Sequence, residues 1–352
     1  MKVRAILIRL ILEGQGIVNF DSKDQKWIYF REESHINKRN HDGVTYAKRN
    51  FYRDADGNLQ SKLKISRDCI LKSTFDEDMI AQSSAIMHHE SLLYNYIASP
   101  YGIIRGYLLP TSQQTLKRKS ALTLSAAEQT CNAIPYLETF SKSGDRGKSK
   151  EAGEKSSNNF YEAETVGNIS YLAEGILDLG ELQFLGADQS LDRFSINPDG
   201  FDKYKQVLDM RLDGAKDLEL KFYKLDGSVV DIAELGVLLT PEQVKTLTKH
   251  TLYRLLTTHI KRKSAFAKTI KMQIKLVEDP LKDLASEANG WIDIKNSKNI
   301  DDLDFDVKIK YVEVDQGQER AKRAEWEAAL NADKKDTKKK RQKKNEVSGS
   351  EV

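Results

Sequence analysis

Apolar and polar residues alternate or recur along this chain in patterns that predict strands and helices in mixed order. The opening stretch, Lys2 to Glu13, is rich in Ile and Leu and ends at two glycines, so it predicts a buried first strand. Alternating runs flank Asp56-Gly57, a pair that favours a tight turn because Gly accepts a positive φ, and they predict a long β-hairpin. Strand character also extends over Ile103 to Leu109, Ile270 to Val277 and Asp304 to Val314.

Two segments carry the signals of a helix start. Thr74 to Glu77 has the spacing of a capping box, and apolar residues then recur on one helical face until Ser99-Pro100. Thr240-Pro241 is followed by Gln243, which places proline at the first helical position and predicts a second helix. The apolar face of this second helix predicts core packing, whereas its other face carries Lys245, Lys249 and Tyr253.

Composition narrows the class of protein. The chain has 352 residues, of which 39 % are apolar and 31 % are charged, and this balance excludes collagen, wholesale disorder and a disulfide-stapled miniprotein. The two cysteines, Cys69 and Cys131, lack the spacing of a zinc ribbon or a redox pair, so two buried thiols are expected. No apolar run is long enough to span a bilayer, and we expect a soluble, cytoplasmic protein without a membrane partner.

Charge is unevenly distributed, although the net charge is only +3. Residues 331–352 hold eight Lys or Arg against four acids, and residues 241–275 hold nine bases against one acid. Residues 151–240, by contrast, hold 18 acids and eight bases. This segregation suits a protein that presents basic surface to phosphate and acidic surface to a neighbouring copy, although ordinary solvated surfaces also produce charge runs.

The sequence contains no complete motif for metal, cofactor or hydrolytic chemistry. Gly144 to Ser149 has two residues between its glycines, whereas a phosphate-binding loop requires four. Asp302, Asp304 and Asp306 alternate as in a calcium loop, but the glycine at position six is missing and alternation also fits the outward face of a strand. We therefore predict no metal and no cofactor, and the expectation of an enzyme is lowered.

Two stretches of the chain carry a family resemblance. Lys64 to Ile70, with the sequence KISRDCI, resembles the first strand-to-helix junction of the backbone subunits of class 1 CRISPR effector complexes. Asn159 to Tyr171, with the sequence NFYEAETVGNISY, resembles a second stretch of these subunits, and the Gly-, Ser- and Lys-rich loop before it stands where that family inserts its thumb. The resemblance covers most of residues 1–315 and is greatest to the minimal type I-F variant, with the type IV backbone subunit a near relative.

The resemblance implies an α+β fold class with an RNA-recognition-motif-like (ferredoxin-like) palm. It implies a palm in residues 1–315, with a hairpin insertion at about 31–67 and a thumb with a mobile loop at about 141–171, and we expect a basic helical or disordered tail at 316–352. The implied function is a non-catalytic subunit that polymerises head to tail along guide CRISPR RNA and presents it to target DNA in antiviral defence. The implied partners are this RNA, the DNA, further copies of the chain, and end-capping and guide-processing subunits of the complex.

Carried over residue by residue, the resemblance places the guide-binding junction at Ser66 and Arg67, where a helix N-terminus and a guanidinium meet a phosphate. Arg105 is expected to line the same groove, and Phe160 and Tyr161 either wedge into the base stack or pack into the core. The other candidate RNA contacts are basic: Lys48, Arg49, Arg53, Lys117, Arg118, Lys119, Lys249, Lys261, Arg262 and Lys263. A surface ion pair or a solvated position is the alternative for these bases.

Two further functions stay open from the sequence. One is a metal-dependent ribonuclease of the same superfamily, with Asp68 or Asp145 as the candidate carboxylate, although Asp68 is also placed to cap a helix. The other is a monomeric RNA-binding protein that uses its basic tail. Deleting residues 331–352 distinguishes this last function from the backbone subunit, because only the monomeric protein would then lose nearly all RNA binding.

Overall fold

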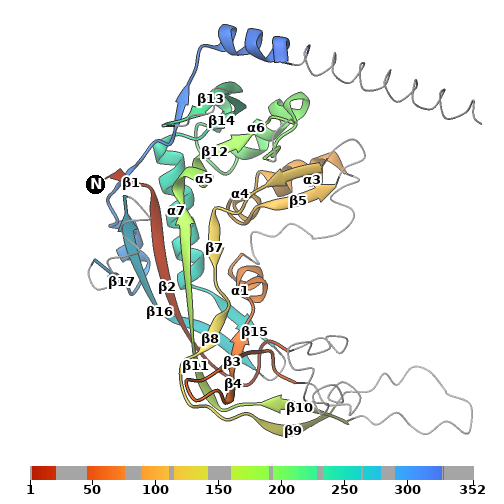
Figure 1. Cartoon of the computed structure of the whole chain (residues 1–352), viewed down its shortest axis with the longest axis vertical. Helices are drawn as coiled ribbons and strands as arrows, with labels where there is room; N and C mark the ends of the chain where they lie inside the picture. Colours follow the sequence, from red (N-terminus) through yellow and green to blue (C-terminus); the bar gives the residue numbers. More distant parts are fainter. Residues whose placement is uncertain are drawn as a thin grey trace, which may run out of the picture.

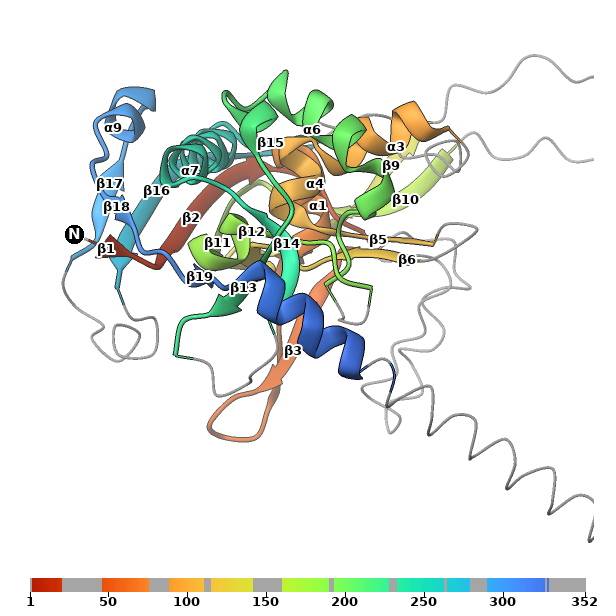
Figure 2. The same ribbon diagram turned by 90° about the horizontal axis from the view of Figure 1, so that it is seen from above.

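The computed structural model shows an α+β fold in which helices cover one face of a nine-stranded sheet (Figures 1 and 2). It describes residues 2–20, 46–75, 89–110, 115–141, 160–189, 193–227, 233–262, 265–278, 290–326 and 328. Within these ranges the nine-stranded sheet is joined by one four-stranded and three two-stranded sheets. The longest helix in the same ranges is too short and too polar to cross a membrane.

Three long strands form the centre of the nine-stranded sheet: β2 (Ala5–Gln15), β11 (Asn168–Asp178) and β16 (Phe266–Val277). β2 lies between the other two and pairs antiparallel with both, so the predicted first strand is confirmed as a buried central strand. The sheet is completed by β3 (Arg49–Arg53), β4 (Leu59–Ile65), β7 (Leu122–Leu124), β8 (Ala127–Gln129), β15 (His259–Lys261) and β17 (Ile292–Ile294).

Two hairpins extend from the same end of this sheet (Figure 1). β3 and β4 form the hairpin predicted around Asp56-Gly57, and Gly57 has a φ of +82° in its turn. β9 (Tyr136–Ser141) and β10 (Phe160–Thr165) form the second hairpin, whose register pairs Ser141 with Phe160. The predicted loop between these last two strands lies outside the described residues.

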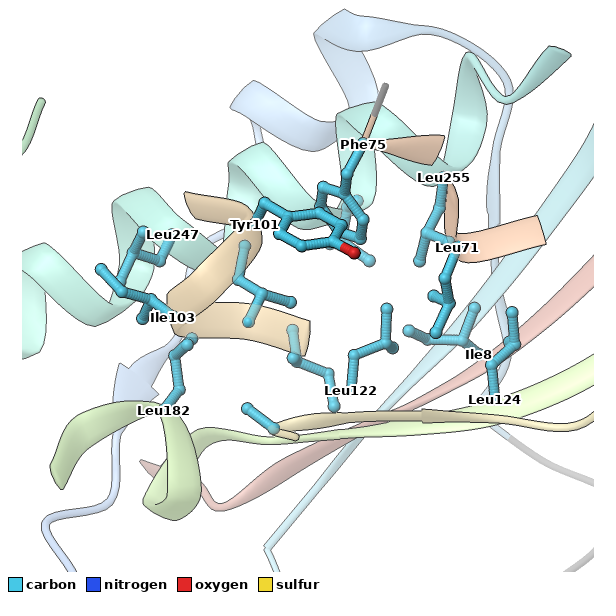
Figure 3. Packing of buried hydrophobic residues seen from close by; sticks show 14 of the residues in the cluster. Ile8, Leu71, Phe75, Tyr101, Ile103, Leu122, Leu124, Leu182, Leu247 and Leu255 are labelled. Carbon is cyan, nitrogen blue, oxygen red and sulfur yellow. The ribbon is translucent and has the colours of Figure 1, made fainter. Parts of the chain in front are cut away.

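The main core lies between the sheet and the helices that cover it (Figure 3). The helices are α1 (Arg67–Thr74), α3 (Glu90–Ile97), α4 (Pro100–Arg105), α5 (Leu179–Gln183), α6 (Phe201–Asp209), α7 (Pro241–Leu256) and α9 (Ser297–Asp301). α7 begins at the predicted start and has a capping box there. Thr240 Oγ1 accepts a hydrogen bond from the Gln243 N–H, and Gln243 Oε1 accepts one from the Thr240 N–H. Figure 3 shows Leu247 and Leu255 of α7 facing the same core as Leu71 of α1.

The other predicted helix start is wrong, because Thr74 ends α1. Its hydroxyl donates a hydrogen bond to the Ile70 carbonyl at 2.9 Å and lies 2.8 Å from the Thr258 hydroxyl. The preceding helix, α3, does end just before Ser99-Pro100, as predicted, and this pair also starts the next helix, α4. Ser99 caps α4, and Ile103 is consequently helical, so the next strand, β5 (Tyr107–Pro110), begins later than predicted.

The four-stranded sheet has the order β12 (Phe184–Gly186), β14 (Glu234–Leu238), β13 (Lys221–Leu225) and β19 (Tyr311–Glu313). The predicted strand from Asp304 to Val314 is therefore two short strands, because β18 (Asp306–Val307) pairs with β1 (Lys2–Val3) before the chain crosses to β13. β5 pairs with β6 (Thr115–Arg118), and single 3-10 turns occur at Pro198–Gly200 and Ala215–Asp217.

Residues 316–326 form a helix that docks on the four-stranded sheet, and the chain beyond it lies outside the described residues apart from residue 328. The Gln316 side chain accepts a hydrogen bond from the Phe222 N–H at 2.9 Å and donates one to its carbonyl at 3.2 Å. Glu319 accepts from the Ala233 N–H at 3.0 Å, and Arg323 donates to the Ala233 carbonyl. Part of the segment predicted as a tail is thus integral to the fold.

One carboxyl near this helix makes stability depend on pH. Burial raises the pKa of Glu234 to about 7 from an ordinary value of 4.5, and the charge of Arg193 only partly opposes this. Because the folded protein favours the protonated form, the stability that this form provides is complete below the ordinary value and is lost as the pH rises through about 7.

Glu234→Gln is therefore expected to remove that loss. Relative to the wild type, the variant should gain roughly 1 to 3 kcal/mol in free energy of unfolding between about pH 5 and about pH 8. Chemical denaturation at several pH values measures this difference. Unfolding free energies of wild type and variant that run parallel over the whole range would contradict the assignment.

Candidate nucleic-acid interface

The junction between β4 and α1 places Ser66 at the helix N-cap, in an extended conformation with φ −64° and ψ 148°. Its side chain does not cap the helix, because its Oγ instead accepts a hydrogen bond from Asn19 Nδ2 at 2.8 Å. No side chain therefore covers the N–H groups of the first turn at this position. Backbone N–H groups at a helix start bind anions, since the helix dipole adds to their own polarity.

Arg67, the first residue of α1, is a half-buried cation. Its Nη2 lies 3.5 Å from Ser120 Oγ, and its Nε is buried without a hydrogen-bond partner. Among the described residues no carboxylate lies within 4 Å of this guanidinium. In the described part of the chain, its guanidinium therefore meets a hydroxyl and no anion. A phosphate would supply the opposite charge and accept hydrogen bonds from it.

Arg105 reaches the same helix start from the last turn of α4. Its Nη2 lies 3.2 Å from Asp68 Oδ1, its Nη1 donates to the Tyr101 hydroxyl, and its guanidinium lies 5.2 Å from the Tyr101 ring centroid. The Asp68 side chain is 76 % exposed, so this ion pair is accessible to solvent. Asp68 therefore holds Arg105 beside Arg67 instead of capping α1 through a hydrogen bond.

Three further cations surround Cys69 in the first turn of α1. Burial raises the pKa of the half-buried Cys69 thiol, and the nearby charges of Arg262, Lys48 and Lys72 act in the opposite direction. The Arg262 guanidinium also donates to the Val18 carbonyl at 3.1 Å. We refer to Lys48, Arg67, Lys72, Arg105 and Arg262 as the α1 basic cluster.

The α1 basic cluster gathers residues from distant parts of the sequence. Lys48 precedes β3, Arg105 ends α4, and Arg262 follows β15, which packs against α1. Figure 1 shows α1 between α4 on one side and the β3–β4 hairpin on the other. Arg105 is paired with the exposed Asp68, whereas Lys48, Lys72 and Arg262 lie near Cys69, the next residue of α1. Together with Arg67, these cations outnumber that carboxylate and create a field that attracts a polyanion.

Two predicted RNA contacts have a structural role here, and this corrects the prediction for both. Arg118 is 6 % exposed and donates to the carbonyls of Ile103, Glu181 and Phe184 at 2.8 to 3.2 Å. Arg49 forms two hydrogen bonds with Glu164, at 2.6 and 2.9 Å, and both side chains are only about one-tenth exposed. These guanidiniums use their donors inside the protein, so neither is free to meet a phosphate.

The other predicted bases are distributed over several elements of the fold. Lys249 Nζ donates to the Asp301 carbonyl at 2.7 Å, which ties α7 to α9, and Arg53 Nη1 donates to the Gly57 carbonyl at the tip of the β3–β4 hairpin. Lys261 is exposed beside Arg262. Lys117 is held in β6, whereas Lys119 is exposed and lies 3.5 Å from Glu181.

Three predicted contacts have no described side chain. Lys263 lies outside the described residues, and the side chains of Phe160 and Tyr161, at the start of β10, do so as well. The sequence reasoning in turn missed Lys72, in the last turn of α1. A helical projection of Arg67 to Thr74 would have indicated that this lysine shares the helix with the predicted junction.

Comparison of the sequence with known proteins identifies a family. Residues 30–279 match the family described as "Type I-Fv CRISPR-associated protein Cas7fv-like". Among curated proteins, none is similar enough in sequence to match.

Two solved structures are similar in part to this chain. One, titled "CRISPR RNA-guided surveillance complex", is 12 % identical, with 78 % of this chain and 71 % of that chain covered at a TM-score of 0.38. Another, titled "CRISPR RNA-guided surveillance complex, pre-nicking", is 9 % identical, with 78 % and 79 % covered at a TM-score of 0.37. The family match spans more than half of the sequence and confirms the resemblance first seen at the two short motifs. The chain belongs to the Cas7fv-like family of type I-Fv CRISPR-associated proteins.

Proposed function

We propose that this chain is a non-catalytic subunit that binds guide RNA through the α1 basic cluster and polymerises head to tail along it. Successive copies would hold the sugar-phosphate backbone, and the guide bases would pair with target DNA. End-capping and guide-processing subunits would complete the complex in the cytoplasm.

The observation that carries the proposal is the start of α1. The N-cap side chain makes no capping hydrogen bond, and Arg67 has no carboxylate partner among the described residues. Four further cations lie in or beside the helix, near Asp68 and Cys69. Such a site fits a backbone phosphate, because the N–H groups and guanidiniums donate to oxygen without reading a base. Membership of the Cas7fv-like family of CRISPR-associated proteins supports guide RNA as the nucleic acid that binds here.

The order of the central elements supports an RNA-recognition-motif-like palm. Along the chain, β2, α1, β7, β11, α7 and β16 follow one another as strand, helix, strand, strand, helix and strand. In the sheet, β16, β2 and β11 are neighbours in that order, and β7 pairs with the far side of β11. This order supports a ferredoxin-like unit in which α1 and α7 would be the two helices.

Coexpression with a CRISPR array tests the proposal. The full chain is purified, and the nucleic acid that accompanies it is extracted, sized and sequenced. We expect RNA of uniform repeat-spacer sequence in an assembly much larger than the 40.0 kDa monomer. Random short RNA, or RNA-free monomer, would contradict it.

Two controls separate the rival functions. Removing residues 331–352 should leave most RNA binding intact, with a shallower salt dependence. A monomeric protein that binds RNA through its tail would instead lose nearly all binding. Prolonged incubation of the assembly with magnesium and a target RNA should leave the RNA intact. Cleavage that disappears in Asp68→Ala would instead indicate a ribonuclease.

A further inference from the structure

A second group of cations surrounds one carboxylate, at the junction of α5, β6 and β19. The Glu181 carboxylate is 10 % exposed and lies 3.5 Å from Lys119 Nζ, 3.5 Å from Arg193 Nη1 and 3.6 Å from Lys310 Nζ. Three cations therefore share one anion. Their charges outweigh the effect of burial and lower the pKa of Glu181, so this carboxylate is ionised at neutral pH.

The surroundings do not neutralise the excess. Arg118, buried beneath the group, adds a positive charge and is met by carbonyl oxygens alone. Glu234 carries only part of a negative charge near neutral pH, since burial raises its pKa to about 7. Asp188 lies 2.5 Å from Arg323, and Asp178 Oδ1 accepts hydrogen bonds from the Gly180 and Glu181 N–H groups. Among the described residues, the positive charges around Glu181 thus outnumber the negative ones, and the approach of an anion would relieve this excess.

The cations are held in place by packing. Arg193 Nη1 donates a hydrogen bond to the Tyr311 hydroxyl at 3.1 Å, and the Tyr311 ring stacks on Phe184 with centroids 4.5 Å apart. The stem of Lys310 crosses Gly180, where a Cβ would lie only 2.4 Å from its Cδ. Positioned donors lose less conformational entropy when a ligand arrives, so this arrangement favours binding.

The group is open to solvent through Lys119 and Arg193. The Lys119 side chain is 68 % exposed and that of Arg193 is 39 % exposed, whereas Lys310 lies deeper at 16 %. Lys119 directly precedes Ser120, whose Oγ lies 3.5 Å from Arg67 Nη2. Lys119 thus adjoins, in sequence, the residue that Arg67 contacts, so one strand can contact both side chains.

We propose that Lys119, Arg193 and Lys310 form a second phosphate site, which binds a backbone phosphodiester next to the one held by the α1 basic cluster. This inference rests on the function proposed above, since it extends the path of the same nucleic acid. The phosphodiester belongs either to the guide RNA or to the DNA strand paired with it. Both present the same chemistry to the three cations.

The test compares Lys119→Gln/Arg193→Gln with a matched pair on α6, Lys203→Gln/Lys205→Gln, which removes two positive charges that lie near Glu90 and Asp202. One arm measures the affinity of the full chain for single-stranded RNA of the guide sequence over a range of salt concentrations. The other measures capture of complementary DNA by the RNA-loaded protein.

We expect Lys119→Gln/Arg193→Gln to bind about tenfold more weakly than the wild type at low salt in one of the two arms. The slope of log affinity against log salt should fall by about 0.7 for each lost contact to a single strand. A loss in the RNA arm assigns the phosphate to the guide, and a loss only in the DNA arm assigns it to the target strand. Values within about twofold of the α6 pair in both arms would overturn the inference.

Two further measurements keep the outcome interpretable. Lys119→Gln alone alters a side chain that is 68 % exposed and should fold as the wild type does, with part of the same loss. Arg67→Gln reports on the α1 basic cluster separately. If Arg67→Gln weakens binding and the double variant does not, the second site fails and the proposed function stands.

Discussion

Arg67→Glu is expected to weaken binding of guide-sequence RNA about 10- to 100-fold at low salt. The substitution removes a half-buried guanidinium that the described carboxylates leave unpaired, and it places a negative charge at the helix start where phosphate would bind. The plot of log affinity against log salt should become shallower by about 0.7, the amount that one contact to a single strand contributes. Fluorescence anisotropy over a salt series measures both quantities.

Lys216→Glu provides the matched control for this charge reversal. Lys216 is exposed in the 3-10 turn Ala215–Asp217, remote in sequence from α1, and only its backbone N–H is engaged, by Asp209. We expect this control to change the affinity less than threefold. Equal losses in the two variants would mean that net charge alone governs binding and that α1 is not the site.

Arg118→Met is expected to destabilise the fold by about 3 to 5 kcal/mol. Methionine keeps much of the apolar stem but leaves the carbonyls of Ile103, Glu181 and Phe184 without their donor inside the protein. Lysine at this position should restore only part of the loss, because one ammonium cannot satisfy three carbonyls that suit a planar guanidinium. Urea unfolding followed by circular dichroism measures the free energy.

Lys119→Gln, at the next residue, removes a positive charge without removing buried hydrogen bonds, so it serves as the control for Arg118→Met. Its exposed side chain should change the free energy of unfolding by less than about 0.5 kcal/mol. Arg67→Glu, by contrast, should lose RNA binding with little loss of stability. If Arg118→Met is as stable as the wild type, the buried hydrogen bonds do not support the fold in the way described.

Much of the fold follows from local signals in the sequence. The central strand β2, the β3–β4 hairpin with its Asp56-Gly57 turn and the capped start of α7 are each specified by neighbouring residues. Local signals fail where one motif fits two positions. Thr74 has a capping-box spacing but ends α1, because its hydroxyl bonds back to the helix and meets Thr258, 184 residues further along.

The candidate site is predictable only in part, for the same reason. The β4–α1 junction is continuous in sequence, so Ser66 and Arg67 can be placed at a helix start from seven residues. Arg118 and Arg67 look alike in sequence, yet one is surrounded by carbonyls and the other reaches a hydroxyl. That difference depends on the packing of α4 and α5, which no local pattern encodes. Arg193 and Lys310 were missed because they meet only across Glu181.

The ion pair between Arg49 and Glu164 ties the β3–β4 hairpin to the β9–β10 hairpin. Glu164 also accepts a hydrogen bond from the Ala47 N–H at 2.7 Å, so it holds the chain on both sides of Lys48. A force that tilts the β9–β10 hairpin is transmitted through this carboxylate to Ala47 and Arg49, on either side of Lys48. If Lys48 binds RNA as proposed, the angle of that hairpin and the position of this cation against the RNA are mechanically coupled.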